Sequence, residues 1–197
     1  MKKTLLLTPV LLFASSMLYA QSTTSLTDVA MLLFKNVKTK LTIAEQNQVA
    51  AKTGFVLSGN KDQPFAADKD SKEYPFAAFV YPTDMNKDGK EEIFVVFGNT
   101  FTSGNAGSSI TLYIKNAAGT YMPHLGFPGT IPEALTTSSM SYPDLLIGGP
   151  GMEYPVQRWN GKTYVFNRTV KDKDYGKLKK KGIDAMSKTY QESITMK

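Results

Sequence analysis

The chain has 197 residues, of which 42% are hydrophobic, a net charge of +6 and no cysteine. Without cysteine it can form no disulfide, no thiolate-ligated metal site and no lipid-modified cysteine, whereas its hydrophobic content is sufficient for the core of one ordinary domain. Much of the positive charge gathers in residues 173–182, KDYGKLKKKG. Because few aromatic residues are interleaved with these lysines, we expect a solvated face and no nucleic-acid partner.

The first twenty residues have the three parts of a secretory signal peptide. Two lysines follow the initial methionine, the run from Leu5 to Leu12 is largely apolar, and small residues lead to Ala20. The apolar run is interrupted and falls short of the roughly 20 residues that a membrane-spanning helix needs. We therefore expect cleavage between Ala20 and Gln21, no membrane span, and a single exported domain over residues 21–197, either periplasmic or secreted.

Two helices are predicted next. In residues 22–40, Ser25 can cap a helix and Asp28 completes a capping box. In residues 41–55, Thr42 and Glu45 form a second capping box, and Gly54 is a natural C-terminal stop. The residues expected to face inward are Val29, Leu32, Leu33 and Val37 in the first helix and Ile43, Val49 and Ala50 in the second.

From Phe55 onward, short runs of β-forming residues alternate with turns. The run at 92–99, EIFVVFGN, is too continuously apolar for a surface strand and predicts burial on both faces. A polar loop is expected at 61–75, a glycine-rich turn at 98–109 and an irregular segment at 117–132. Further strands are expected at 55–59, 76–82, 110–116 and, just before a Gly-Gly pair, within 141–151.

Asn160 and Gly161 give the strongest hairpin signal in the chain, a type I′ turn between two strands. The segment 183–194 then predicts a terminal helix with Ile183, Met186, Tyr190 and Ile194 at helical spacing. The predicted fold class is therefore α+β, with two N-terminal helices, an antiparallel-rich β-sheet in the middle and a short C-terminal helix.

The segment 81–99, YPTDMNKDGKEEIFVVFGN, carries the clearest functional pattern. Oxygen-bearing side chains stand at the first, third and fifth positions of a loop, a glycine at the sixth permits a sharp turn, and the ninth residue is acidic. Calcium takes six to eight oxygen ligands from side chains, backbone carbonyls and water, which this spacing can gather around one point. The predicted calcium ligands are Asp84, Asn86, Asp88, the Lys90 carbonyl and Glu92.

An EF-hand is excluded because position eight is Glu91, position twelve is Val95, and the flanks predict strands. The loop instead resembles the calcium loop of integrin-type FG-GAP repeats, D-x-N-x-D-G-x-x-[DE], over about fifteen residues. That resemblance implies a calcium loop between two strands. A partial echo at 141–151 has Asp144 before an apolar strand but lacks the other ligands, so a propeller of several repeats is not supported.

The alternative interpretation of the loop is a polar turn, because Asp and Asn readily bond their own backbone before a glycine. The regular spacing, the glycine and the acidic ninth residue together favour calcium. Even a weak site, with Kd on the order of 10⁻⁴ to 10⁻³ M, would fill outside the cell. We expect a structural role for the ion.

Other candidates are weaker. His124 is the only histidine, so it cannot build a histidine-based zinc site. A Ser–His–Asp triad would need it as the base, but no serine lies in a G-x-S-x-G elbow, and a surface-loop histidine is expected. Trp159 and Tyr164 lie on the two arms of the hairpin and could form an aromatic platform for sugar or peptide, although packing of a sheet face is the commoner role.

The sequence therefore favours an exported, non-enzymatic binding module with one structural calcium site, whose partner is an unidentified protein or an envelope glycan. The alternative is an envelope or secreted hydrolase of glycans or peptides that uses carboxylates from residues 61–75 and 84–92. A third hypothesis, inhibition of a foreign hydrolase by a protruding loop, rests only on size, export and basicity.

Overall fold

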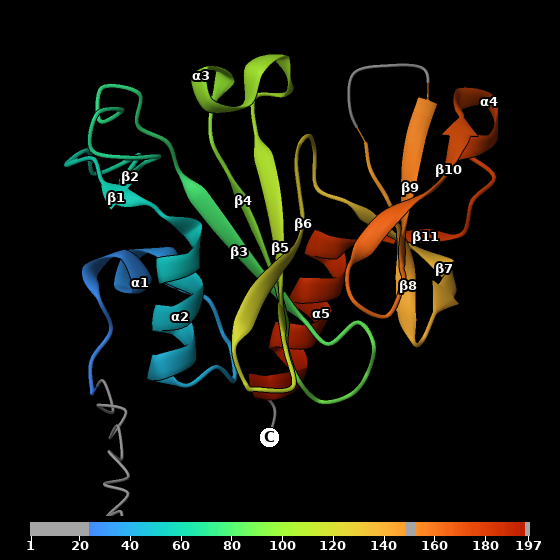
Figure 1. Ribbon diagram of the computed structural model, residues 1–197, viewed down its shortest axis with the longest axis horizontal. Coiled ribbons are helices and arrows are strands. Elements are labelled where there is room, and N and C mark those ends of the chain that lie inside the picture. The colour runs from blue at the N-terminus through green and yellow to red at the C-terminus, as the bar shows by residue number, and fades with distance from the viewer. Residues whose placement is uncertain (1–23, 149–152, 196–197) are drawn as a thin grey trace, which may run out of the picture.

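The computed structural model describes residues 24–148 and 153–195, and their α+β architecture confirms the predicted fold class (Figure 1). The expected signal peptide lies outside these residues. None of the helices in the described part of the chain has the length and apolarity that a bilayer crossing requires. The helices are α1 (Asp28–Leu33), α2 (Ile43–Thr53), α3 (Thr100–Ser103), α4 (Asp172–Tyr175) and α5 (Ile183–Thr195), with a 3-10 turn at Gly104–Ala106.

A four-stranded antiparallel sheet with the order β3-β4-β5-β6 forms the centre of the fold. The helices α1 and α2 lie on one side of it, and α5 and a second sheet lie on the other (Figure 1). As predicted, β4 is buried on both faces: Ile93 and Val95 pack with the N-terminal helices, and Phe94 packs on the opposite side. The strands are β3 (Ala78–Thr83), β4 (Glu92–Phe97), β5 (Ser109–Lys115) and β6 (Tyr121–Pro128).

The second sheet has five antiparallel strands in the order β10-β9-β8-β7-β11. Its inner face shares a core with the four-stranded sheet and α5, and its outer face packs against α4 and the turn that follows. A two-stranded ribbon, β1-β2, lies near the N-terminal helices (Figure 1). The strands are β1 (Val56–Leu57), β2 (Phe65–Ala66), β7 (Glu133–Ser139), β8 (Tyr142–Leu146), β9 (Glu153–Trp159), β10 (Tyr164–Lys171) and β11 (Lys180–Gly182).

Three hydrophobic clusters hold these layers together. One joins α1 and α2 to the four-stranded sheet, the second fills the space between the two sheets and α5, and the third lies on the outer face of the five-stranded sheet. Central members are Leu33, Val49, Ile93 and Tyr121 in the first, Phe94, Leu112, Leu145 and Ile183 in the second, and Leu135, Leu146, Val156 and Val170 in the third.

The second helix begins and ends as predicted. Both hydrogen bonds of the Thr42–Glu45 capping box are present, and Gly54 ends the helix at a φ of 74°, which an L side chain adopts only at a cost. Val49 and Ala50 are buried as expected. Ile43 was predicted to face inward but is 40% exposed, because as the first helical residue it extends past the edge of the core.

The first helix differs from its prediction at its start. Thr27, not Ser25, is the N-cap, and its Oγ1 accepts a hydrogen bond from the Ala30 amide at 3.2 Å. The buried positions are Ala30 and Leu33, whereas Leu32 is 36% exposed. The small side chain of Ala30 lets α1 pack against α2. The buried face of the helix is therefore shifted by one residue from the predicted apolar stripe.

The segment 117–132 was predicted to be irregular, and this was wrong. It contains β6, which pairs with β5 and has an irregular register beside Leu112. Pro123 and Pro128 hid the strand from the sequence pattern. Proline cannot donate to a ladder, but β6 is an edge strand, where a missing donor is tolerated.

The predicted hairpin is present, but its turn is longer than a two-residue type I′ turn. Trp159 pairs with Tyr164, so residues 160–163 form the connection. The Asn160 side-chain oxygen accepts hydrogen bonds from the Lys162 and Thr163 amides, both at 2.9 Å. The asparagine therefore closes the turn through its side chain instead of through a left-handed backbone.

Candidate functional site

The predicted calcium loop is the connection between β3 and β4. It starts one residue after β3 ends and closes at Glu92, the first residue of β4, so it joins two antiparallel strands as the flanking sequence predicted. In Figure 1 it is the green segment beside α5. Gly89 has a φ of 83°, a conformation that glycine adopts without strain. The neighbouring Lys87 also has a positive φ, of 62°.

The acidic and amide side chains of the loop bond to its own backbone. Asp84 Oδ2 accepts from the Gly89 amide at 3.1 Å, Asn86 Oδ1 accepts from the Asp88 amide at 3.1 Å, and Asp88 Oδ1 accepts from the Lys90 amide at 2.8 Å. These bonds set the loop into a tight coil. Because each oxygen has two lone pairs, an oxygen that accepts one N–H can still take part in a second interaction.

The two carboxylate oxygens of Asp84 differ in their contacts. Asp84 Oδ1 is buried and accepts no hydrogen bond among the described residues. A buried carboxylate oxygen without a donor costs about 1–3 kcal/mol or more. The hydrogen bond from Gly89 fixes the other oxygen, so Oδ1 is held at a defined place in the loop.

Glu92 is the most enclosed acid of the set, with 1% of the residue exposed. Its Oε2 accepts from the Met85 amide at 2.8 Å, and its Oε1 accepts from the Tyr142 hydroxyl at 3.3 Å. In the described part of the chain, Glu92 forms no ion pair with a lysine or arginine; Lys90, the nearest basic residue in sequence, lies 3.9 Å from Asp88 instead.

Burial raises the pKa of Glu92 from 4.5 to about 8. The hydrogen bond from the Met85 amide opposes this rise, and the negative charges of Asp88 and Asp84 contribute to it. The pKa of the Tyr142 hydroxyl is also raised, chiefly by burial and by the charge of Glu92. Without a cation, the geometry therefore favours a protonated Glu92 near neutral pH.

Glu91, which excluded the EF-hand, anchors the loop instead. It is 3% exposed, and its carboxylate accepts hydrogen bonds from the Thr39 hydroxyl and, at 2.7 Å, from the Lys40 amide. Both donors lie in the connection between α1 and α2. The end of the loop is therefore tied to the N-terminal helices, a link that no sequence pattern indicated.

The five predicted ligands share one loop, but they do not form a ready-made cage of acidic side chains. Across the described residues, no three Asp, Glu, His or Cys side chains are grouped as a metal site. The loop instead offers side-chain oxygens of two aspartates and one asparagine above the buried carboxylate of Glu92. The unpartnered Asp84 Oδ1 is the atom that best fits an added cation.

The hairpin aromatics lie in the core between the sheets. Tyr164 is 5% exposed and donates to the Pro143 carbonyl at 3.0 Å. Trp159 packs edge-on against Tyr164 with ring centroids 5.5 Å apart and contacts Tyr142 at 4.7 Å. This arrangement agrees with packing of a sheet face, the alternative that the sequence offered.

The histidine lies in a strand, so the expectation of a surface loop was wrong. His124 belongs to β6, its ring is 5.3 Å from that of Trp159, and its Nε2 is buried without a partner among the described residues. Burial lowers the pKa of His124. The ring is therefore neutral at physiological pH and packs as part of the aromatic group.

The acids of residues 61–75 lie apart from the enclosed Glu92. Asp68 is exposed, and its Oδ1 accepts from the amides of Asp70 and Ser71 at 3.0 and 2.8 Å and from the Ser71 hydroxyl. The hydrogen bond from that hydroxyl lowers the pKa of Asp68. These contacts make Asp68 the organiser of its own turn.

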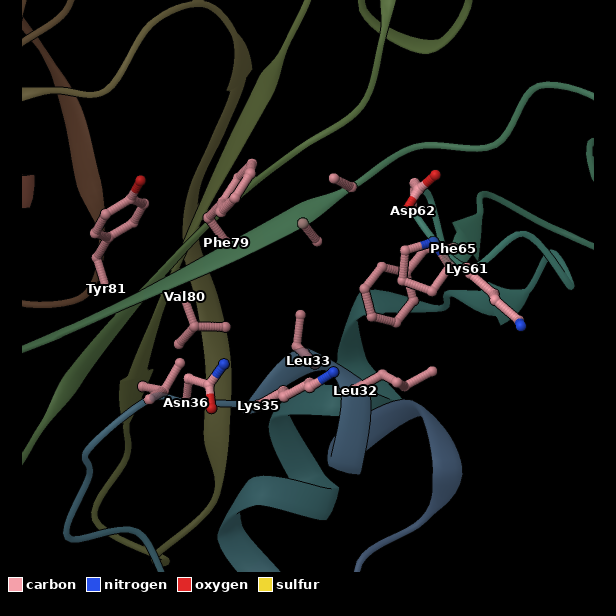
Figure 2. A pocket seen from close by; sticks show the side chains of 14 residues that line it. Leu32, Leu33, Lys35, Asn36, Lys61, Asp62, Phe65, Phe79, Val80 and Tyr81 are labelled. Atoms are coloured by element: carbon pink, nitrogen blue, oxygen red, sulfur yellow. The ribbon is translucent and has the colours of Figure 1, made fainter.

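A pocket of about 370 Å³ lies along the edge strand β3. Figure 2 shows Val80 pointing toward Leu33, with Phe79 and Tyr81 on the opposite side of the strand. None of the predicted calcium ligands or hairpin aromatics lines this pocket. Further residues that line it are Leu32, Lys35, Asn36, Lys61, Asp62 and Phe65.

Sequence reasoning missed a second charged cluster, centred on Asp144. This residue is 0% exposed, and it accepts hydrogen bonds from Thr137, Arg158 and Arg168. Its place before an apolar strand was noted as an echo of Glu92, but neither arginine was connected with it. Their side chains converge only because β8, β9 and β10 are neighbours in the sheet.

Comparisons of the chain with protein-family models, with curated proteins and with solved structures found no match.

Proposed function

We propose that this chain is an exported, non-enzymatic binding module whose β3–β4 loop binds one structural calcium ion. The observation that carries the proposal is the buried, uncompensated acid at the base of the loop. Glu92 is 1% exposed with the charges of Asp84 and Asp88 nearby, and Asp84 Oδ1 is buried with no donor in the described part of the chain. A divalent cation brings two positive charges to these three carboxyl groups and favours the ionised form of Glu92, which hydrogen bonds from neutral donors cannot do.

Residues of the loop would hold the ion without refolding the chain. Asp84 offers its free Oδ1, while its Oδ2 stays bonded to Gly89. Asp88, Asn86 and Glu92 offer further side-chain oxygens and Lys90 a backbone carbonyl, a set of hard oxygen donors that suits calcium. The ion would fix the turn between β3 and β4 and, through Glu91, its attachment to the N-terminal helices.

The hydrolase alternative stays a prediction without a supporting contact. Asp68 is exposed and bonded within its own turn, whereas Glu92 is enclosed. A pair of catalytic carboxylates needs a shared cleft that admits substrate. The binding-module hypothesis requires no such cleft. Its partner would be an unidentified protein or an envelope glycan.

The test is thermal unfolding in calcium and in chelator, with Asp84→Ala plus Asp88→Ala as the test variant. At a calcium concentration about 100 times Kd, binding stabilises the folded state by about 2.7 kcal/mol, roughly 5–10 °C for a chain of this size. The double variant is expected to lose this response. Asp62→Ala plus Asp70→Ala removes two exposed aspartates outside the loop and is the matched control. An equal response in wild type and in the loop variant would refute the calcium site.

A further inference from the structure

The outer face of the five-stranded sheet carries two arginines on one buried carboxylate. Arg158 of β9 donates from Nε to Asp144 Oδ1 and from Nη2 to Oδ2, both at 2.8 Å. Arg168 of β10 donates from Nη1 to Oδ2 at 3.2 Å, and the Thr137 hydroxyl donates to the same oxygen at 2.5 Å. Every oxygen of Asp144 is therefore satisfied, and Arg158 alone already forms the forked pair that a carboxylate prefers.

The cluster has more positive than negative charge. Burial alone would raise the pKa of Asp144, but the hydrogen bonds from Arg158, Thr137 and Arg168 lower it to about 2, so the carboxylate is ionised at neutral pH. Among the described residues, Arg158 and Arg168 form ion pairs with Asp144 and with no other acid. Two guanidinium groups on one carboxylate leave a net charge of about +1, because arginine does not lose its proton in proteins.

The arginines also retain unused donors that solvent can reach. Each guanidinium carries five N–H groups, and Asp144 takes two from Arg158 and one from Arg168. The side chains of Arg158 and Arg168 are 39% and 37% exposed, whereas that of Asp144 is fully covered. The buried carboxylate therefore fixes both guanidinium groups from the protein side, and their remaining N–H groups lie on the exposed side.

Among the described residues, this part of the sheet face is only partly covered. On the outer face, Tyr175 of α4 stacks on Tyr154 of β9 with ring centroids 4.4 Å apart, toward the opposite end of β9 from Arg158. Val165, which pairs with Arg158, is 40% exposed, and β10 is the edge strand of the sheet. An incoming group thus meets two fixed guanidinium edges beside a small apolar side chain.

We propose that Arg158 and Arg168 form a binding site for an oxyanion with two acceptor oxygens, a carboxylate or a phosphate group carried by the partner of this chain. Two guanidinium edges held at fixed positions match such a group in geometry as well as in charge. Asp144 positions both arginines and lowers the entropy lost on binding. This site is separate from the calcium loop and stands or falls independently of it.

The experiment titrates the folded chain with inorganic phosphate and, separately, with acetate, and follows the arginine Nε–H signals by NMR. The two arms distinguish a phosphate-binding site from a carboxylate-binding site. We expect saturable shifts of both arginine signals with at least one anion. Arg168→Gln removes the excess charge but keeps the Arg158–Asp144 pair, so it is expected to fold and to weaken binding at least ~10-fold.

Two further variants separate a built site from general charge. Arg168→Lys keeps the charge but loses the planar fork, and it is expected to weaken binding several-fold. Lys162→Gln removes one exposed positive charge from the same hairpin and is expected to leave binding within about twofold, because screened surface charges contribute little. Absence of saturable shifts with both anions, or equal losses in Lys162→Gln and Arg168→Gln, would overturn the proposal.

Discussion

Replacement of Glu92 by glutamine tests the energetic basis of the loop. The pKa of Glu92 is raised to about 8 in the folded chain, against 4.5 in an exposed carboxyl group. Between these two values the folded state binds one proton more than the unfolded state. In chelator, the contribution of Glu92 to the stability of the wild type therefore falls as pH rises, by about 1.36 kcal/mol per pH unit, and levels off above pH 8.

The magnitude follows from the same two values. Moving a carboxyl pKa from 4.5 to about 8 costs the folded state about 5 kcal/mol once Glu92 is ionised. Glutamine is neutral at every pH and escapes this cost, but it loses one of the hydrogen bonds from Met85 and Tyr142, worth about 1–3 kcal/mol when a buried donor is left unpaired. In chelator at pH 8.5, Glu92→Gln is thus expected to be about 2–4 kcal/mol more stable than the wild type.

The assay is urea denaturation of both proteins in chelator at pH values from 5 to 8.5, repeated in excess calcium. The difference in unfolding free energy between variant and wild type should grow with pH in chelator. In calcium the order is expected to reverse, because the wild type gains the ion and the variant lacks an anionic ligand. A difference that is constant across this pH range in chelator would refute the buried, uncompensated carboxylate.

The remaining predictions concern the Asp144 cluster and two phenylalanines of the four-stranded sheet. Arg158→Ala leaves the fully covered Asp144 with a single arginine and is expected to cost about 3 kcal/mol by urea denaturation; a loss below about 1 kcal/mol would show that Arg168 suffices. Phe94→Ala is expected to cost about 3–5 kcal/mol because the side chain is 0% exposed, whereas Phe79→Ala, at 57% exposure, is expected to cost less than about 1 kcal/mol. Equal losses at the two phenylalanines would contradict the difference in burial between these side chains, which lie on the same face of the sheet.

The sequence was informative where a local signal decides the structure. The Thr42–Glu45 capping box and Gly54 fixed the limits of α2, since each acts on backbone groups within a few residues. The uninterrupted apolar run of β4 similarly required burial on both faces. Tertiary packing decided the rest: the proline-containing β6 is a strand because β5 pairs with it.

The position and residue spacing of the candidate loop could be predicted from the sequence, but its energetics could not. The spacing of Asp84, Asn86 and Asp88 is local, so the sequence identified the loop. The hydrogen bond from Tyr142 to Glu92 and the one from the α1–α2 connection to Glu91 each join segments about fifty residues apart in the sequence. No local pattern could therefore indicate them. The convergence of Arg158 and Arg168 on Asp144 is likewise a product of strand order.

The most direct test of the calcium site is a calorimetric titration of the chain from Gln21 onward with calcium, near pH 7 and in two buffers of different ionisation enthalpy. We expect one saturable site and the release of about one proton, because Glu92 is protonated at that pH when no cation is bound. Binding heat that does not depend on the buffer would contradict the protonated Glu92, and the absence of any saturable heat would contradict the site itself.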